Sequence, residues 1–370
     1  RDTLICLRGL IPCGFVDESR EIIHQFAQFE HNGTLPNIIH GKDVSNRDTS
    51  DAPLWLFTAV KDYTVNAGNN DILSMDCNGR TLLETLRSII EHYRKGTENG
   101  IKMDAESGLI FSPSHFTWMD TNYPASTPRE GYPIEIQALW AAALGFMAEC
   151  EPRSKEWEKL REQVLDSIEK YYIQPGQRHL SDCLHARSGE SAKQARPDDA
   201  CRSNQLFAVT LNALRSREVE IAVVRSSECL IVPGAIRSLA DAPVSFPQPI
   251  YHHGKQLNNS KLPYWGQYLG DEDTRRKPAY HNGTAWTWPF PSYCEAMFKL
   301  EPSSRKRALA LLLSGISQMR AGIPGQLPEI TDGNAPHHWR GCAAQAWGMS
   351  EMYRVYALLT QDKITKSKYF

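Results

Sequence analysis

The chain lacks the features that mark a membrane protein or a nucleic-acid-binding protein. No apolar run in its 370 residues approaches the roughly 18–20 residues that a helix needs to cross a membrane. The formal net charge of −2 leaves no basic surplus for binding nucleic acid. We therefore expect neither a membrane nor a nucleic acid as a partner, and the sequence gives no indication of an oligomeric state.

Common metal-binding and catalytic motifs are also missing. The nine cysteines are scattered without CxxC or zinc-ligand spacing, which indicates reduced, cytoplasmic thiols rather than a disulfide framework. The histidines at 252–253 and 337–338 are adjacent pairs, whose side chains diverge instead of sharing an ion. Neither a GxSxG nucleophile elbow nor a phosphate-binding P-loop occurs. We expect no metal ion and no cofactor.

Helical periodicity is the strongest structural signal that is present. Thr81 and Glu84 form a capping-box pattern at the start of one periodic segment. Two other segments, 139–147 and 308–319, are apolar around much of their circumference, which predicts buried helices. The predicted helical segments are 22–29, 82–93, 139–147, 157–171, 308–319 and 343–359. They indicate an all-α fold.

Strand signals are weak, and long connections separate the predicted helices. Only 108–111 and 220–224 are candidates for short strands. The connections are rich in Gly, Pro, Trp, His and acidic residues, and they cover 31–55, 112–135, 174–205, 241–288 and 322–341. Because long loops in a compact protein usually carry function, we look for the site there.

Two carboxylates in these loops have unusual surroundings. Asp120 closely follows Trp118, and an apolar, aromatic setting raises the pKa of a carboxyl group. Glu329 lies in a turn-rich segment, where a carboxylate tends to stay ionised. One acid and one base facing each other across a sugar can break a glycosidic bond. Most carboxylates are solvated surface charges, however, so this pair alone is a hypothesis.

Tryptophans in the same loops fit a sugar site. Trp55, Trp118 and Trp286 lie in or beside these connections. Aromatic rings can stack on the apolar face of a sugar, while carboxylates, amides and guanidinium groups bind its hydroxyls. Core packing at helix ends is the alternative for each tryptophan.

Short strings along the chain occur in an order that resembles one known family. They are RDT at 1–3, TWMD at 117–120, TPR at 127–129, EIQALW at 135–140, NQLF at 204–207, HNGTAW at 281–286, EITDG at 329–333, RGC at 340–342 and QAW at 345–347. The set resembles the amylo-α-1,6-glucosidase domain of glycogen debranching enzymes, from residue 1 to about residue 356. Three positions depart from the family pattern: Thr287, Ser203 and Leu327-Pro328.

The resemblance implies both a fold and a reaction. The fold would be an (α/α)6 toroid, a barrel of six helical hairpins with long functional loops at one end. Residues 1–370 would form one such domain, without the family's β-rich N-terminal region. The reaction would be inverting hydrolysis that releases glucose from α-1,6-linked branch stubs of glycogen or a related α-glucan or branched oligosaccharide.

The resemblance also assigns the site residues. Asp120 would be the catalytic acid and Glu329 the catalytic base, with carboxyl groups about 6.5–9.5 Å apart. Substrate-binding positions carried over from the family, with Trp118 added, are Arg1, Asp2, Asp51, Trp55, Trp118, Arg129, Glu135, Asn204, Gln205, Arg237, His281, Asn282, Trp286 and Arg340. Among them, we expect Asp2, Arg129, Arg237 and Arg340 to hold the rim of the glucose.

Three alternatives remain open at this point. The chain could be another α-glucoside hydrolase on the same toroid, similar to a trehalase or a glucoamylase. It could be a sugar isomerase or epimerase, which would need His281 or His252 to move protons. It could also be a non-catalytic glycan-binding module, which would not require Asp120 and Glu329 to face each other.

Overall fold

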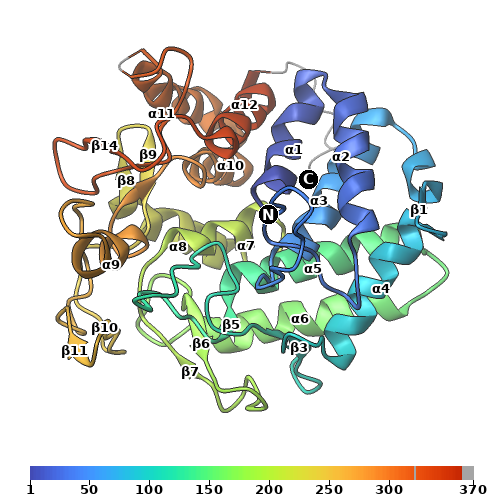
Figure 1. Cartoon of the computed structure of the whole chain (residues 1–370), viewed down its shortest axis with the longest axis horizontal. Helices are drawn as coiled ribbons and strands as arrows, with labels where there is room; N and C mark the ends of the chain where they lie inside the picture. The colour runs from blue at the N-terminus through green and yellow to red at the C-terminus, as the bar shows by residue number, and fades with distance from the viewer. Residues whose placement is uncertain (321, 361–370) are drawn as a thin grey trace.

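Helices account for most of the regular structure (Figure 1). The computed structural model describes residues 1–320 and 322–360. One group of helices forms the interior: α1 (Asp2–Cys13), α3 (Ala52–Ala67), α5 (Ile134–Cys150), α7 (Leu206–Thr210), α10 (Phe290–Leu300) and α12 (Ala346–Thr360). Each inner helix packs against the next in this order, and α12 packs against α1.

A second group of helices covers the first from outside. It consists of α2 (Val16–Gln28), α4 (Leu82–Lys95), α6 (Glu156–Tyr172), α8 (Arg217–Ser226) and α11 (Arg305–Gln318). α2 packs on α1 and α3, α6 packs on α5, α8 packs on α7 and α10, and α11 packs on α10 and α12. α4 packs against α2.

The burial of side chains explains why the two groups differ in sequence. Outer helices bury one stripe: in α4 the stripe includes Leu86, Ile89 and Tyr93, while the opposite face is solvated. Inner helices have neighbours on every side, so nearly all of α5 from Ile134 to Met147 is buried. Apolar residues around the whole circumference are therefore required there.

Most of the predicted helices are confirmed. Segments 22–29, 82–93, 139–147, 157–171 and 343–359 lie in α2, α4, α5, α6 and α12. The capping box is present, with Thr81 Oγ1 accepting from the Glu84 amide and the Glu84 carboxylate accepting from the Thr81 amide. The predicted pairing near 108–111 is also confirmed, since β4 (Ile110–Phe111) pairs with β3 (Lys102–Met103).

Two predictions about elements are wrong. The 220–224 segment is part of helix α8, not a strand, because Ser216 caps the helix by accepting from the Val219 amide, and acidic residues occupy its first turn. The 308–319 segment is helical but not buried all round. Its helix α11 is an outer helix that buries Ala308 and Leu312 and leaves Leu313 40% exposed.

Short strands join the loops at one end of the helices. The largest sheet has the order β14-β13-β12-β9-β8, and all its pairs are antiparallel. Its strands are β8 (Ile231–Val232), β9 (Ala235–Arg237), β12 (Ala285–Trp286), β13 (Ile330–Thr331) and β14 (Trp339–Arg340). Trp286 pairs with Ile330, so Glu329 lies directly beside this ladder.

The remaining elements are short. Two hairpins are formed by β1 (Asp76–Cys77) with β2 (Arg80–Thr81) and by β10 (Tyr251–His252) with β11 (Lys255–Gln256). A three-stranded sheet contains β5 (Gly131–Pro133), β6 (Cys183–His185) and β7 (Arg196–Pro197). The short helical segments are η1 (Asp71–Ser74), η2 (Ser203–Gln205), η3 (Ser227–Leu230), η4 (Glu272–Arg276), α9 (Lys277–Tyr280) and η5 (Pro302–Ser304).

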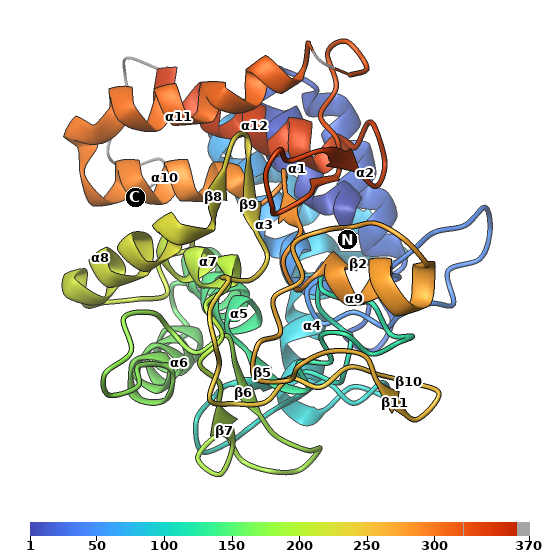
Figure 2. The ribbon, with the colours of Figure 1, turned by 90° about the vertical axis from the view of Figure 1, so that its left-hand side faces the viewer.

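The inner helices all begin at the same end of the molecule. Residues near helix starts, such as Arg1 and Trp347, line one cavity, while residues near helix ends, such as Asn66 and Glu149, line another. Figure 2 shows the helices from the side, with α9 and the β10–β11 hairpin at the right, the end where the N-terminus lies. The long loops therefore gather over the N-terminal ends of the inner helices.

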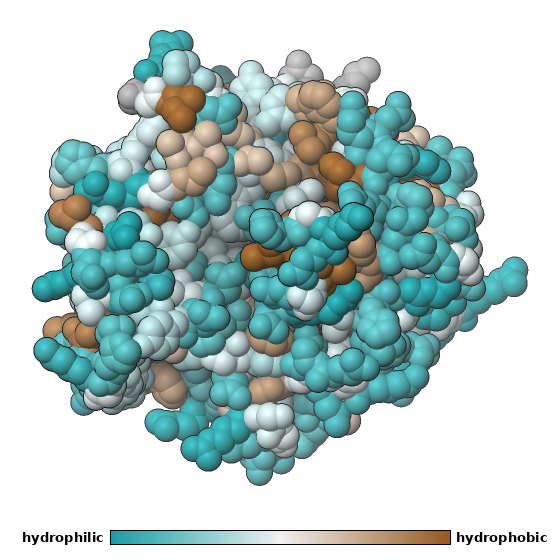
Figure 3. All heavy atoms as spheres, viewed as in Figure 1, coloured by the Kyte–Doolittle hydropathy of each residue, from teal (hydrophilic) through white to brown (hydrophobic). Residues whose placement is uncertain are grey.

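The face of the molecule shown in Figure 3 is mainly hydrophilic, with small scattered apolar patches. Among residues 1–320 and 322–360, no helix combines the length and apolar character that crossing a bilayer demands.

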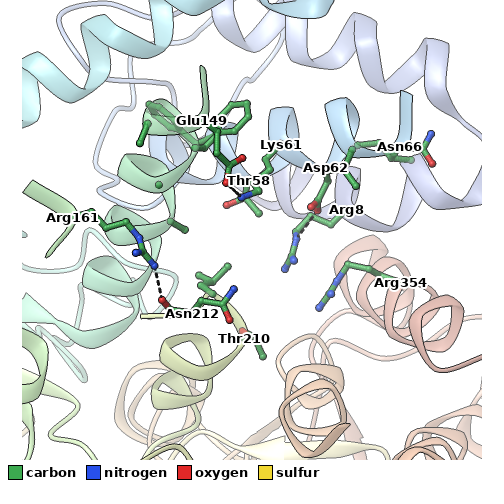
Figure 4. Close-up of a pocket in the computed structure, with 18 of the residues that line it drawn as sticks. Arg8, Thr58, Lys61, Asp62, Asn66, Glu149, Arg161, Thr210, Asn212 and Arg354 are labelled. Carbon is green, nitrogen blue, oxygen red and sulfur yellow. Dashed lines mark hydrogen bonds and ion pairs between the residues drawn. The ribbon is translucent and has the colours of Figure 1, made fainter. Parts of the chain in front are cut away.

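The cavity at the opposite end, about 740 Å³ in volume, is lined by a buried ionic network (Figure 4). Arg8 Nε donates to Asp62 Oδ2 over 3.1 Å. Arg354 Nη2 donates to Glu295 Oε2 and Glu351 Oε2 over 2.7 and 2.8 Å. These ion pairs tie α1 to α3 and α12 to α10.

Removing the Arg354 guanidinium should destabilise the fold strongly. Arg354→Met would leave Glu295 buried without its ion-pair partner and Glu351 with Arg8 alone, 3.7 Å away, which costs about 3–5 kcal/mol. Arg215→Met is the matched control, because Arg215 pairs with carboxylates on the surface and such pairs contribute roughly 0–1 kcal/mol. Urea unfolding of both variants measures the two free energies. Similar small losses in both would contradict a stabilising role for the buried network.

Candidate functional site

A cavity of about 510 Å³ lies where the inner helices begin. Both predicted catalytic carboxylates, Asp120 and Glu329, line it, although they come from distant parts of the sequence. The other predicted site residues that line it are Arg1, Asp2, Trp118, His281 and Trp286. The fold therefore brings together an acid pair, a guanidinium group and aromatic rings.

Three donors hold the Glu329 carboxylate. Its Oε1 accepts from the Tyr280 hydroxyl and from Gln345 Nε2, and its Oε2 accepts from the Cys342 amide over 2.9 Å. Burial and the neighbouring Glu329 raise the pKa of Tyr280, so its hydroxyl keeps the proton that it donates. Glu329 is 9% exposed, and its orientation is fixed by protein contacts.

A glycine makes room for this carboxylate. Gly341 has a φ of 65°, and a Cβ atom placed on it would overlap Glu329 Oε2. The Cys342 amide that donates to Glu329 follows directly in the chain. Glycine at this position therefore allows the backbone to approach the carboxylate closely.

Asp120 is the more accessible member of the pair. Its side chain is 39% exposed, and Oδ2 accepts from Arg1 Nη1 over 3.1 Å. Arg1 is itself fixed, because Nε donates to Asp51 Oδ1 over 2.9 Å and Nη2 donates to the Thr117 carbonyl over 2.9 Å. A carboxyl group positioned in this way can exchange a proton with a molecule in the cavity.

Aromatic rings form one wall of the cavity. The Trp118 ring packs edge-on against Trp286, Trp288 and His281, with centroids 5.0, 5.2 and 5.3 Å apart. Its Nε1 donates to Asn204 Oδ1 over 2.8 Å. This wall is apolar and lies next to the carboxylates, but Trp118 and Trp286 are each 2% exposed, so most of their ring surface is covered by protein.

His281 is buried in this wall and stacks on Trp286, with centroids 5.1 Å apart. Burial, followed by the nearby Arg202 guanidinium, lowers the pKa of His281 well below its usual range. Within the described part of the chain, neither ring nitrogen has a hydrogen-bond partner. The ring is therefore a neutral group at the edge of the cavity.

Several predicted site residues lie behind the cavity wall. Arg129 forms ion pairs with Glu135 and Asp182, and all three side chains are almost completely buried. The predicted residues in this supporting layer are Asp51, Trp55, Arg129, Glu135, Asn204, Gln205 and Asn282. Trp55 packs edge-on against Trp288, with centroids 6.4 Å apart, so its ring belongs to the core here.

The predicted glucose-rim residues divide in the structure. Asp2 lines the cavity. Arg129 is occupied by Glu135 and Asp182, and Arg340 binds Asp332 through two nitrogens. Arg237 Nε donates to the Gly333 carbonyl over 2.8 Å, and its Nη1 donates to the Cys229 carbonyl over 3.2 Å. These three guanidinium groups hold loops and helices in place.

Sequence reasoning missed several residues that line the cavity, and three of them lie at or beside Glu329. Tyr280 and Gln345 hold Glu329, and Trp347 lines the same space. Tyr280 directly precedes the HNGTAW string, and the other two belong to the QAW string, so the family strings carried a signal for them. Asp182, the partner of Arg129, had no such signal.

Two of the departures from the family pattern contact each other. Thr287 Oγ1 donates to the Pro328 carbonyl over 2.7 Å, and the Thr287 amide donates to the Glu329 carbonyl over 3.3 Å. Thr287 thus binds the peptide groups on both sides of Glu329.

Comparisons with known proteins found similarity to a family model and to a relative. A family model described as "Amylo-alpha-1,6-glucosidase" matches residues 1–354. A glycogen debranching enzyme of Saccharomyces cerevisiae (strain ATCC 204508 / S288c) is 23% identical over 397 aligned residues, covering 83% of this chain. The chain spans 25% of the length of that relative.

The neutral state of His281 should be visible in its titration. Since its pKa is lowered in the folded state, the unfolded state binds one more proton as the pH falls below about 6.5. The free energy of unfolding should therefore fall with decreasing pH, by up to about 1.4 kcal/mol per pH unit from this group.

Two measurements check this expectation. The NMR signal of the His281 ring, assigned by its absence in His281→Gln, should stay unchanged between about pH 5 and 8. The His281→Gln variant should show a shallower dependence of unfolding free energy on pH, with His40→Gln as the control at an exposed position. A ring that titrates near its usual value would contradict the assignment.

Proposed function

We propose, on the premise that the chain belongs to the amylo-alpha-1,6-glucosidase family, that it is a glycoside hydrolase of the debranching type. Its substrate is an α-glucan or branched oligosaccharide, from which it releases glucose at α-1,6-linked branch stubs. The observation that carries the proposal is that Asp120 and Glu329 line the same cavity beside an aromatic wall. A second support is the likeness to the yeast debranching enzyme.

The fold proposed for residues 1–370 is the (α/α)6 toroid. The sequence of contacts from α1 through α3, α5, α7, α10 and α12 back to α1 supports an inner ring. The outer helices that cover this ring support the same arrangement. Loops over one end then give a pocket that accepts a chain end, which an exo-acting enzyme needs.

The proposed mechanism divides the chemistry between the two carboxyl groups. Asp120 donates a proton to the glycosidic oxygen as the bond to C1 breaks. Glu329 removes a proton from a water molecule that attacks C1 from the opposite face, so the anomeric configuration inverts. The accessible position of Asp120 suits contact with a leaving group, and the fixed position of Glu329 suits the orientation of a water molecule.

Asp120 has to exchange partners during the reaction. Arg1 Nη1 donates to Asp120 Oδ2 over 3.1 Å here. Proton donation therefore requires that the glycosidic oxygen becomes the closer partner of Asp120 when substrate is bound. Asp51 and Thr117 hold Arg1 in place while this happens.

The alternatives differ in what they require of the cavity. A hydrolase of trehalose or another α-glucoside would use the same acid and base, so comparing activity on isomaltose or panose with activity on trehalose distinguishes it from a debranching hydrolase.

An isomerase would need a histidine that moves protons, whereas the lowered pKa of the buried His281 favours a neutral ring that is not easily protonated. His252, the other candidate, lies on β10 in the loops. A binding module would not need Glu329 to be held by three donors.

The first test of the proposal replaces the acid and the base. Asp120→Asn and Glu329→Gln should each lower kcat on an α-1,6-linked oligosaccharide by at least about 10²–10⁴-fold, because each removes one proton-transfer group. Both variants should still bind the glucan, as measured by calorimetry.

The anomer of the product distinguishes the outcomes. Proton NMR during turnover by the wild-type protein should show β-glucose as the first product. α-Glucose would overturn inversion, and bound glucan without any glucose would favour the binding module. Glu91→Gln, at a surface pair with Lys95, is the control for loss of a carboxylate and should keep wild-type activity.

The second test moves the base without removing it. Gly341→Ala would push the Glu329 carboxylate out of place and should lower kcat by about 10²-fold or more. Gly325→Ala is the matched control. Gly325 also has a positive φ, of 77°, but a Cβ atom there would meet nothing within 4 Å. Equal activity of the two variants would show that the position of Glu329 is not critical.

A further inference from the structure

The sulfur atoms of Cys201 and Cys229 both lie close to one backbone oxygen outside the cavity. Cys201 precedes η2, and Cys229 lies in η3 at the end of α8. Their Sγ atoms lie 3.7 and 3.3 Å from the carbonyl oxygen of Ser226. The two side chains also hydrogen-bond to each other, and both thiols are free.

The two thiols have opposite surroundings. Cys229 is exposed, and its pKa is lowered to about 7 by the hydrogen bond from Cys201, followed by the nearby Arg237 guanidinium. Arg237 Nη1 donates to the Cys229 carbonyl over 3.2 Å, which holds the positive charge beside the residue. Cys201 is only partly exposed, and its hydrogen bond to Cys229 raises its pKa. Cys229 is thus the more accessible thiol and has the lower pKa, and Cys201 is the more protected one.

We propose that Cys229 is a site of oxidation by small hydroperoxides and that Cys201 then closes a reversible disulfide with it. The approach of both sulfurs to one carbonyl oxygen, the exposure of Cys229 and the guanidinium group beside it carry this inference together. It does not depend on the proposed hydrolase activity.

The chemistry balances with hydrogen peroxide as the oxidant. The Cys229 thiolate attacks one peroxide oxygen, the O–O bond breaks, and the released hydroxide takes up a proton to become water. The Cys201 sulfur then attacks the sulfenic sulfur of Cys229, the S–O bond breaks, and a second water leaves as the disulfide forms. Two thiols are oxidised, and one peroxide is reduced to two water molecules.

The disulfide would connect to the cavity wall through the residues that follow Cys201. Arg202 Nη2 donates to Asn282 Oδ1 over 2.8 Å. Asn204 Oδ1 accepts from Trp118 Nε1 over 2.8 Å. Closing the disulfide would join this segment to η3 covalently. Oxidation would therefore affect the segment that holds the Trp118 ring through Asn204.

The experiment first compares thiols within the wild-type chain. Iodoacetamide at pH 7, with the products located by mass spectrometry, should label Cys229 about ten-fold faster than the exposed Cys13. After treatment with an equimolar amount of hydrogen peroxide, the 201 and 229 peptides should appear cross-linked, two hydrogens lighter, and dithiothreitol should separate them. Equal labelling of Cys229 and Cys13, or no cross-link, would overturn the proposal.

Serine variants assign the two roles. Cys201→Ser should stop the reaction at a Cys229 sulfenic acid, which dimedone captures, and Cys229→Ser should prevent both products. Cys13→Ser is the matched control and should form the cross-link like the wild type. Dimedone capture at Cys201 in the Cys229→Ser variant, at the wild-type rate, would contradict the assignment. The labelling rates in the wild-type chain remain a test even if a variant folds poorly.

Discussion

The site depends on one constraint, that the inner helices begin at the same end of the molecule. The first turn of a helix has backbone N–H groups without helical partners and carries a partial positive charge, so it favours acidic side chains. Asp2 and Glu135 lie in first turns of α1 and α5, and Asp51 is at the N-cap position of α3. Acidic and polar residues are therefore stabilised together at the end where the loops arrive.

Residues at these helix starts contribute in two ways. Some reach the cavity: Arg1 and Gln345 directly precede α1 and α12, and Asp2 lies in the first turn of α1. Others are buried and need charged partners, as Glu135 does in the first turn of α5. Glu135 has Arg129, and Arg129 also binds Asp182, whose Oδ1 accepts from Asn204. Since Asn204 binds Trp118, the buried ion pairs support the aromatic wall from behind.

Three of the outer helices, α2, α4 and α6, were predicted well from the sequence, whereas α8 was predicted as a strand and four inner helices were missed. The difference between α2, α4 and α6 and the missed inner helices has a physical reason. An outer helix such as α4 alternates buried and solvated faces, which leaves a periodic signal. An inner helix such as α3 is buried from Ala52 to Val60 without interruption, so periodicity is absent, and the polar residues near its start resemble a loop. α1, α7 and α10 were missed for the same reason.

The site residues follow the same division. Asp120 and Glu329 were predicted because each has distinctive neighbours in the sequence and matches a family string. Tyr280 was missed although it directly precedes the HNGTAW string, because the contact of its hydroxyl with a carboxylate 49 residues later exists only in three dimensions. The guanidinium groups of Arg237 and Arg340 were assigned to substrate because sequence alone does not reveal the carbonyl and carboxylate partners that occupy them.

The departures at Thr287 and Pro328 have a joint physical meaning that neither has alone. A proline at 287, common in the family pattern, would carry neither an amide hydrogen nor a hydroxyl group. Thr287 has both, and it uses them on the carbonyls of Pro328 and Glu329. Pro328 restricts its own φ and the conformation of Leu327, so the backbone before Glu329 is stiff. The hydrogen bonds from Thr287 hold the same stretch of backbone in place. The hydrogen bond from the Thr287 amide continues the β12–β13 ladder, which pairs Trp286 with Ile330. The ladder and Thr287 therefore fix the backbone of Glu329, while the Cys342 amide holds its carboxylate.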